Sequence, residues 1–348
     1  MKWVIRFLIA LAIAVACLAG YAIATARSSA RPVGLQVVQW HGAHGRPMPV
    51  GLWYPTSARP RPTTFVGATL LDVASNGAVS GEHLPAVVIS HGNGGGIASH
   101  VDLAMDLASA GYVVVAPMHP GDNFADQGGQ GSAALFNDRA DDVRASIDFL
   151  TKAWTGRSHV DADRIGAYGF SAGAFTVLTL IGATPDLSAI PVHCRRTPEF
   201  ICNALVQLKS PLLDSHASAR GFRADPRIKA AVIAAPGLGF TFADGGVSNV
   251  RVPVQLWSGT RDSTVPYATN TKFVRDGLGT RAEFHEMRGA THFAFLAPCG
   301  LLRPPVLCSD PAGFDRDAAH AAMNAAIVRF LNATLSTHRA TSGASNDG

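Results

Sequence analysis

The sequence contains little charge and none of the residue spacings typical of metal sites. Asp, Glu, Lys and Arg make up 16% of the 348 residues, and the formal net charge at pH 7 is +4. Basic residues are scattered along the chain, which argues against nucleic acid as a partner. No C-x-x-C or H-E-x-x-H spacing occurs, so the residue spacing does not support a zinc site. No internal repeat is found, which excludes repeat architectures. We therefore expect neither a metal nor a cofactor.

Apolar residues are abundant and account for 47% of the chain. A share of this size indicates a well-filled globular core and excludes a disordered protein. Without an apolar N-terminal segment, roughly 320 residues remain, which suffices for one large α/β domain or two small ones.

That apolar segment follows Lys2 and Arg6, and no further charge occurs until Arg27. A basic start, an apolar centre and the small residues Ala-Thr-Ala at 24–26 are typical of a secretory signal peptide. The run is also long enough to span a bilayer as an uncleaved anchor. We expect residues 1–26 to be a signal peptide or an N-terminal anchor. The protein would then be secreted or periplasmic, and held at the inner membrane if the segment is retained.

Export changes the interpretation of the five cysteines, of which Cys17 lies in the targeting segment. The other four allow three pairings, and an oxidising compartment favours the two that close short loops. We expect disulfides between Cys194 and Cys202 and between Cys299 and Cys308. A metal site and free buried thiols are the alternatives.

The central motif is Gly169-Phe-Ser-Ala-Gly173, which has the pattern G-x-S-x-G. A strand-like run precedes it and an apolar, helix-compatible run follows it. A serine between a strand and a helix lies on a strained turn that exposes its hydroxyl, and glycines relieve the crowding. The pattern predicts Ser171 as a nucleophile. A purely structural strand–helix turn is the alternative, since the chain contains 35 glycines.

Around this motif, apolar strands alternate with helices, which predicts an α/β fold with a mainly parallel, doubly wound sheet and helices on both faces. The strands are expected at 86–90, 112–117, 165–168, 228–235, 252–257 and 282–287, and the helices at 99–110, 137–154, 172–181 and 315–336. Asn137 would cap its helix, with Asp138, Asp141 and Asp142 on a solvated face. Two antiparallel strands are expected within 35–54, followed by a surface connection over 57–85.

The expected domain therefore covers residues 35–338, and residues 339–348 form a polar tail that we expect to be disordered. Residues 184–224 interrupt the alternation and are rich in Pro and Ser. An insertion at this point lies above the carboxyl ends of the strands. We interpret it as a lid over the serine, and a passive disulfide-clipped excursion is the alternative.

Two further side chains complete a catalytic set. A serine hydroxyl needs a base, a neutral imidazole supplies one, and a carboxylate orients the imidazole. Asp262 follows the strand 252–257, and His292 lies on the loop after the strand 282–287. Both therefore lie at the rim where Ser171 opens. Asp244 and Asp276 are weaker candidates for the acid, because neither directly follows a strand.

The loop His91–Gly96 follows the strand 86–90 and contains no G-K-[ST], so it is not a phosphate loop. In serine hydrolases such a loop supplies one of two backbone N–H groups that bind the oxyanion. We predict the N–H groups of Asn93 and Ala172 for this role, with His91 bracing the loop. His119, Phe170 and Phe293 are candidates for the wall of the substrate pocket.

These motifs together resemble the α/β-hydrolase superfamily. More narrowly, Leu52-Trp-Tyr-Pro55, Ser90-His-Gly92 and Gly111–Pro117 resemble the platelet-activating-factor acetylhydrolase-like and predicted dienelactone hydrolase-like group. The resemblance covers roughly residues 35–335 and implies the same nucleophile, acid, base and oxyanion donors. Dienelactone hydrolases typically carry a cysteine where this chain has Ser171, so the substrate class does not carry over.

The sequence thus predicts a secreted serine hydrolase that cleaves carboxylic esters through an acyl-enzyme. The expected partner is a small-molecule or lipid-like ester. A peptidase, a thioesterase or an acyltransferase would use the same three residues and is the first alternative. A non-catalytic binding protein on this fold is the second, and the presence of all three residues argues against it.

Overall fold

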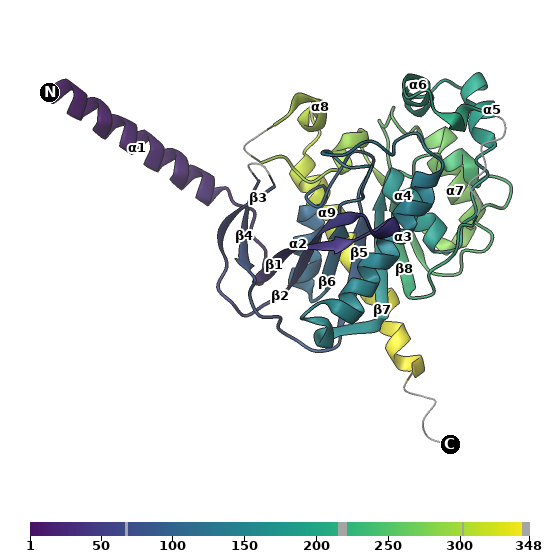
Figure 1. Ribbon diagram of the computed structural model, residues 1–348, viewed down its shortest axis with the longest axis horizontal. Helices are drawn as coiled ribbons and strands as arrows, with labels where there is room; N and C mark the ends of the chain where they lie inside the picture. Colours follow the sequence, from purple (N-terminus) through teal and green to yellow (C-terminus); the bar gives the residue numbers. More distant parts are fainter. Residues whose placement is uncertain (67–68, 215–220, 301–302, 343–348) are drawn as a thin grey trace, which may run out of the picture.

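The computed structural model describes residues 1–66, 69–214, 221–300 and 303–342. Within this part of the chain, ten strands form one sheet in the order β10-β9-β8-β7-β5-β6-β2-β1-β4-β3 (Figure 1). The strands are β1 (Val33–His41), β2 (Pro47–Pro55), β3 (Arg61–Phe65), β4 (Thr69–Ser75), β5 (Leu84–Ser90), β6 (Val113–Pro117), β7 (Val160–Phe170), β8 (Ile228–Ala234), β9 (Val254–Gly259) and β10 (Ala282–Met287).

Strands β5 to β10 all run parallel, while β2 pairs antiparallel with β1 and with β6. The parallel strands are continuous apolar runs because both of their faces are covered. Val113, Val114 and Val115 of β6 are all fully buried, for example. This arrangement confirms the predicted α/β fold with a mainly parallel sheet.

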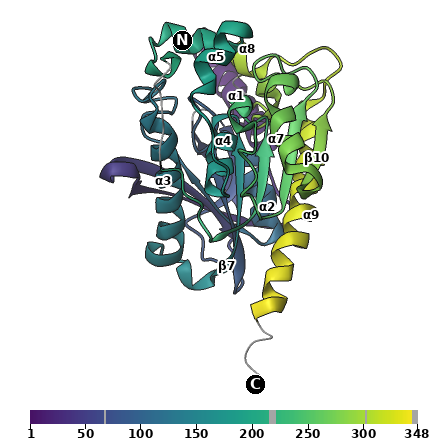
Figure 2. The same cartoon turned by 90° about the vertical axis from the view of Figure 1, so that its right-hand side faces the viewer.

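Helices cover the two faces of the sheet, and each face has its own apolar core. Helices α2 (Val101–Ala110) and α9 (Arg316–Ser342) pack on one face. Helices α3 (Ala134–Asp148), α4 (Ala172–Leu180) and α7 (Thr271–Leu278) pack on the other. Figure 2 shows α3 and α9 on opposite sides of the sheet.

Two details of the expected secondary structure are wrong. Residues 57–85 are not only a surface connection, because β3 and β4 pair with each other and β4 pairs with β1. The inward-facing Leu71 and Val73 are buried and stabilise this extension of the sheet. Asn137 does not cap its helix, since α3 begins earlier, at Ala134, whose N–H donates to the hydroxyl of Ser132.

The predicted insertion contains α5 (Ala189–Arg196) and α6 (Phe200–Gln207), and residues 215–220 within it lie outside the described part. A disulfide between Cys194 and Cys202 joins these helices, and a second between Cys299 and Cys308 joins the loop after β10 to α8 (Pro305–Cys308). The expected tail begins inside a helix, because α9 extends to Ser342, and residues 343–348 are not described.

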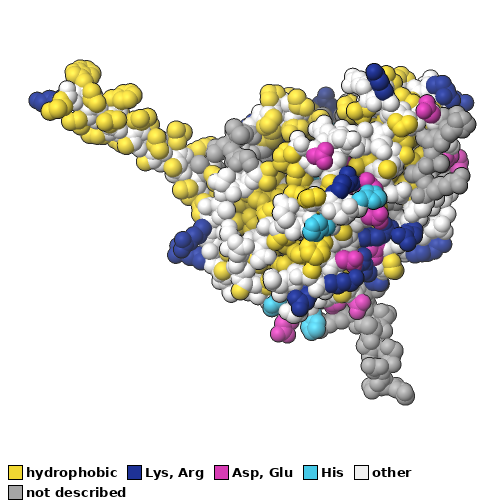
Figure 3. All heavy atoms as spheres, viewed as in Figure 1, with side chains coloured by type: hydrophobic (Ala, Val, Ile, Leu, Met, Phe, Trp, Pro, Cys, Tyr) yellow, Lys and Arg dark blue, Asp and Glu magenta, His cyan; other side chains and the backbone are white. Residues whose placement is uncertain are grey.

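The N-terminal helix α1 (Lys2–Ala24) projects away from the sheet (Figure 1). Its apolar side chains are exposed along its length, as Figure 3 shows. Residues Lys2–Tyr21 are long and apolar enough to cross a membrane, and none of this stretch is buried against the protein. Both interpretations of the segment, signal peptide and anchor, are compatible with this helix.

His100, at the start of α2, predicts a pH-dependent stability. Its ring packs against Tyr168 and Phe170 and is 3% exposed, and burial lowers its pKa from 6.5 to about 4. Between pH 6.5 and 4 the unfolded chain therefore holds a proton at this residue that the folded chain lacks. The free energy of unfolding falls as the pH decreases through this window, and His100 contributes about 3 kcal/mol to the loss.

Denaturant unfolding between pH 7 and pH 4.5 measures this effect. A His100→Gln variant cannot take up the proton, so its stability should fall less steeply with decreasing pH. The control is His41→Gln, because His41 is exposed. Equal slopes for wild type and His100→Gln would contradict the assignment.

Candidate active site

Ser171 lies between the last residue of β7 and the first residue of α4. Its backbone has φ 55° and ψ −115°, a conformation that residues other than glycine rarely adopt. Neighbouring elements hold the turn in this conformation. The N–H of Ser171 donates to the carbonyl of Ala234 at the end of β8, and its carbonyl accepts from Gly237 and Phe175.

The two glycines of the motif allow the backbone to cross at close range. A Cβ at Gly173 would lie 1.9 Å from the carbonyl oxygen of Ser90, and a Cβ at Gly169 would lie 2.3 Å from the carbonyl oxygen of Gly173. These distances are far below van der Waals contact. The motif is therefore required by the approach of α4 to the ends of β5 and β7.

His292 and Asp262 lie beside this serine. The Nε2 atom of His292 is 3.0 Å from the Oγ atom of Ser171, and its Nδ1 atom is 2.8 Å from Oδ2 of Asp262. The other oxygen of Asp262 accepts from the N–H groups of Thr264 and Val265. A carboxylate has no proton to donate, so Nδ1 of His292 must carry the ring proton and donate to Asp262. Nε2 of the neutral ring is then unprotonated and can accept the proton of the serine.

The ends of three parallel strands bring these side chains together, as the sequence predicts. Asp262 follows β9, and His292 begins the 3₁₀ turn His292–Phe295 after β10. The imidazole also packs on Phe170, with the ring centroids 4.8 Å apart. His292 is 4% exposed and Asp262 is 7% exposed, so water has little access to their hydrogen bond.

The predicted oxyanion donors line the same cavity as Ser171. Ala172 is the first residue of α4, and Asn93 lies in the glycine-rich loop after β5. Within the described residues, neither backbone N–H has a hydrogen-bond acceptor in the protein. Both groups are thus free to donate to a ligand.

A cavity of about 660 Å³ opens beside the serine. Phe170 and Phe293 line it, as expected, and so does Asp122. Residues of the insertion cover part of it, including Ile201, Leu205 and Leu212. Further apolar lining comes from Phe136, Phe175, Leu238, Val265 and Leu296.

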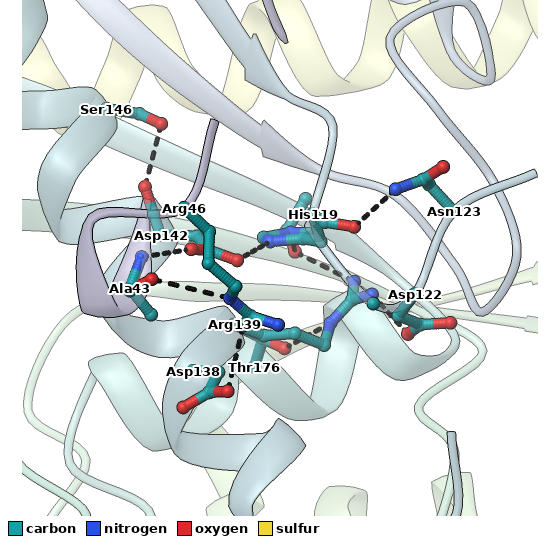
Figure 4. A network of polar contacts seen from close by, with 12 residues as sticks. Ala43, Arg46, His119, Asp122, Asn123, Asp138, Arg139, Asp142, Ser146 and Thr176 are labelled. Atoms are coloured by element: carbon teal, nitrogen blue, oxygen red, sulfur yellow. Dashed lines mark hydrogen bonds and ion pairs between the residues drawn. The ribbon is translucent and has the colours of Figure 1, made fainter. Parts of the chain in front are cut away.

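The expectation for His119 is wrong, because this residue does not line the cavity. It is fully buried behind the glycine-rich loop, with Nε2 2.9 Å from the Ser90 hydroxyl and Nδ1 3.0 Å from Asp142 (Figure 4). Asp142 is fully buried as well, which corrects its expected place on a solvated face. The turn between β1 and β2 covers it, and the N–H of Ala43 donates to it.

Ser90, His119 and Asp142 thus repeat the order of contacts found at Ser171, but none of the three is exposed. Burial lowers the pKa of His119 well below 6.5 and raises the pKa of Asp142 to about 6. A substrate cannot reach Ser90, so this second set is structural.

Sequence reasoning missed Arg139, which is 1% exposed and pairs with Asp122 at 2.6 Å. It lies on α3 among the buried positions Ala140, Val143 and Ile147. A charged residue next to the apolar stripe of a helix was the available signal. Among the described residues, no group of three His, Cys, Asp or Glu side chains is placed to hold a metal ion.

Comparison with known proteins gives a family match and a structural likeness. Residues 73–231 match the model of the dienelactone hydrolase family, a range that includes Ser171 and ends before Asp262 and His292. The ferulic acid esterase from Streptomyces cinnamoneus has a similar structure, with a TM-score of 0.62 and 18% identity over 90% of this chain and 93% of that chain. At this identity the likeness concerns the fold alone. No protein with a curated description matches the sequence.

The crowding at Gly173 gives a direct test of the turn. We expect Gly173→Ala to destabilise the protein by about 3 kcal/mol or more, because the new Cβ overlaps the carbonyl of Ser90 and the backbone must shift. The control is Gly300→Ala, since nothing lies within 4 Å of a Cβ there. Chemical denaturation of both variants measures the difference. A Gly173→Ala variant as stable as the control would contradict the packing argument.

Proposed function

We propose that this protein is an exported serine esterase. The starting point is a carboxylic ester hydrolase with the α/β-hydrolase fold, similar to the dienelactone hydrolase group. Ser171 is its nucleophile, His292 its general base and Asp262 the acid that orients the base. The observation that carries this proposal is the chain of hydrogen bonds from Ser171 to His292 to Asp262 at the edge of an apolar cavity.

The first half of the reaction forms an acyl-enzyme. Ser171 Oγ attacks the carbonyl carbon of the ester while His292 Nε2 takes the hydroxyl proton. The imidazolium formed at this point is stabilised by Asp262 at Nδ1 and then gives its proton to the departing alkoxide. Water, activated by the same imidazole, cleaves the acyl-enzyme and restores the serine.

The negative charge that develops on the carbonyl oxygen is bound by the N–H groups of Asn93 and Ala172. Both are backbone groups without another acceptor in the described chain, and Ala172 stands at the N-terminal end of α4. Donors that are oriented before the reaction stabilise the transition state more than the planar ester, which is the main source of rate enhancement in such sites.

The substrate class follows from the cavity. Its lining is mostly apolar, with several phenylalanines, and its volume of about 660 Å³ lies in the range of small-molecule sites. We infer esters whose acid or alcohol part is apolar and of moderate size. The structurally similar protein acts as a ferulic acid esterase, so an aromatic acid is included among the substrates to be tested.

Export rests on two features. The apolar helix α1 follows a basic start, and two disulfides close short loops in the described part of the chain. Fractionation of cells that express the full chain, with N-terminal sequencing of the product, distinguishes a cleaved signal peptide from a retained anchor.

Hydrolysis of p-nitrophenyl esters of graded chain length, and of an ester of ferulic acid, tests the proposed function. We expect wild-type protein to cleave esters and to react with a fluorophosphonate probe. Ser171→Ala should lower kcat by at least about 10⁴-fold, and Asp262→Asn by about 10⁴-fold, because each removes one member of a unit that acts together.

Thioesters and peptide anilides in the same panel separate the alternative acyl-transfer activities. A wild-type protein that reacts with the probe but cleaves only a thioester or an anilide would correct the substrate class. Full ester hydrolysis by Ser171→Ala would refute the assigned nucleophile.

A further inference from the structure

A buried arginine connects the two backbone segments that carry the proposed oxyanion donors. Arg139 projects from α3 toward Asp122 (Figure 4), and it is 1% exposed. Its contacts fall into two groups, one toward the end of β5 and the glycine-rich loop after it, and one toward α4. The guanidinium has five N–H donors in a rigid plane, so it can hold several acceptors in fixed relative positions.

The contacts toward the loop are made directly and through Asp122. Nη2 of Arg139 donates to the carbonyl of His91, and Nη1 lies 2.6 Å from Oδ2 of Asp122. The other oxygen of Asp122 accepts from the side-chain amide of Asn93 at 2.8 Å and from the N–H of Gly94 at 3.0 Å. The loop is therefore bound on both sides of the Asn93 N–H.

The contact toward α4 runs through one hydroxyl. Nε of Arg139 donates to Oγ1 of Thr176 at 3.2 Å, and this hydroxyl donates to the carbonyl of Ala172 at 3.0 Å. Thr176 is fully buried, so water does not compete for these bonds. One guanidinium thus reaches the residues of both oxyanion donors.

We propose that Asp122 and Arg139 are positioning residues for the oxyanion hole, and that Thr176 is their link to α4. They act through Asn93 and Ala172 and do not touch the reacting atoms. Glycines give the loop little stiffness of its own, since Gly92, Gly94, Gly95 and Gly96 surround Asn93. The ion pair supplies the stiffness that the glycines lack. This inference rests on the proposed function and adds the residues that set its transition-state binding.

If Asp122 had a purely structural role, its replacement would lower stability alone. If it positions the oxyanion donors, its replacement also lowers binding of the transition state. The test variant is Asp122→Asn, which keeps the size of the side chain but removes the charge and one acceptor. We expect kcat to fall about 10- to 100-fold with KM within about threefold, because displaced donors weaken binding of the transition state and not of the planar ester. The rate of Ser171 phosphonylation by a fluorophosphonate should fall by a similar factor.

The matched control is Asp225→Asn. Asp225 is also buried and also pairs with an arginine, Arg227, at 2.6 Å. It lies just before the first residue of β8, whereas Ser171 lies beside the last residue of that strand, at the opposite end. This variant should lose thermal stability while its kcat and phosphonylation rate stay within about twofold of wild type.

Thr176 provides a second, milder pair of variants in case Asp122→Asn folds poorly. Thr176→Val removes the hydroxyl at nearly constant volume and should lower both rates about 3- to 10-fold. Thr176→Ser keeps the hydroxyl and should restore them. Equal rates for the Val and Ser variants, or an unchanged kcat in folded Asp122→Asn, would overturn the proposal.

The two readouts separate this inference from the proposed function. If wild type cleaves no ester but reacts with the probe, the substrate class is wrong, and the phosphonylation rates still decide the role of Asp122. If wild type does neither, both proposals fall, since no working oxyanion hole would exist to be positioned.

Discussion

One crowded crossing of the backbone determines where chemistry can occur in this protein. The chain leaves β7, turns at Ser171 with a positive φ, and starts α4 so close to the end of β5 that Gly173 has no room for a Cβ. Such a turn is strained, and it persists because strands β5 and β8 hold it on either side. The same crossing places Ser171 and the first residue of α4 at the wall of the cavity. The neighbouring strands of the parallel sheet therefore help to hold the proposed nucleophile in place.

Two polar networks lie on either side of this serine, and the proposals give each a different role. On one side His292 and Asp262, which follow β10 and β9, form the chain of hydrogen bonds to Ser171 that the proposed proton transfer uses. On the other side Arg139 pairs with Asp122, which accepts from the side-chain amide of Asn93 in the glycine-rich loop, and we propose that these contacts position the oxyanion donors. A nearby Ser-His-Asp set centred on His119 has similar distances but no exposure. The two sets differ in access, because Ser171 lines the cavity and Ser90 is fully buried, so the three contacts alone do not identify a candidate active site.

Much of the fold and of the candidate site could be predicted because the signals were local. Apolar runs gave the parallel strands, and each proposed triad member follows such a run within a few residues. Two of the wrong predictions concerned which residues other segments cover. Asp142 was predicted to be solvated, but the turn at Ala43 covers it. Residues 57–85 were predicted to be a surface connection, but Leu71 and Val73 in this stretch are buried in the sheet. A short stretch of sequence does not show which distant segment will pack over it, so burial of this kind cannot be predicted from local sequence.

The sequence by itself determined the class of fold, the strained serine turn and the order of Ser171, Asp262 and His292 along the chain. These follow from periodicity, glycine placement and the rule that parallel strands end at a common edge. Only the tertiary structure decided which histidine faces the cavity and which charges are buried. It alone joined Arg139 to both oxyanion segments, because that contact depends on α3 packing beside α4 over the ends of β5 and β7. Hydrogen bonds between distant segments exist only once packing has removed water and brought their partners within about 3 Å.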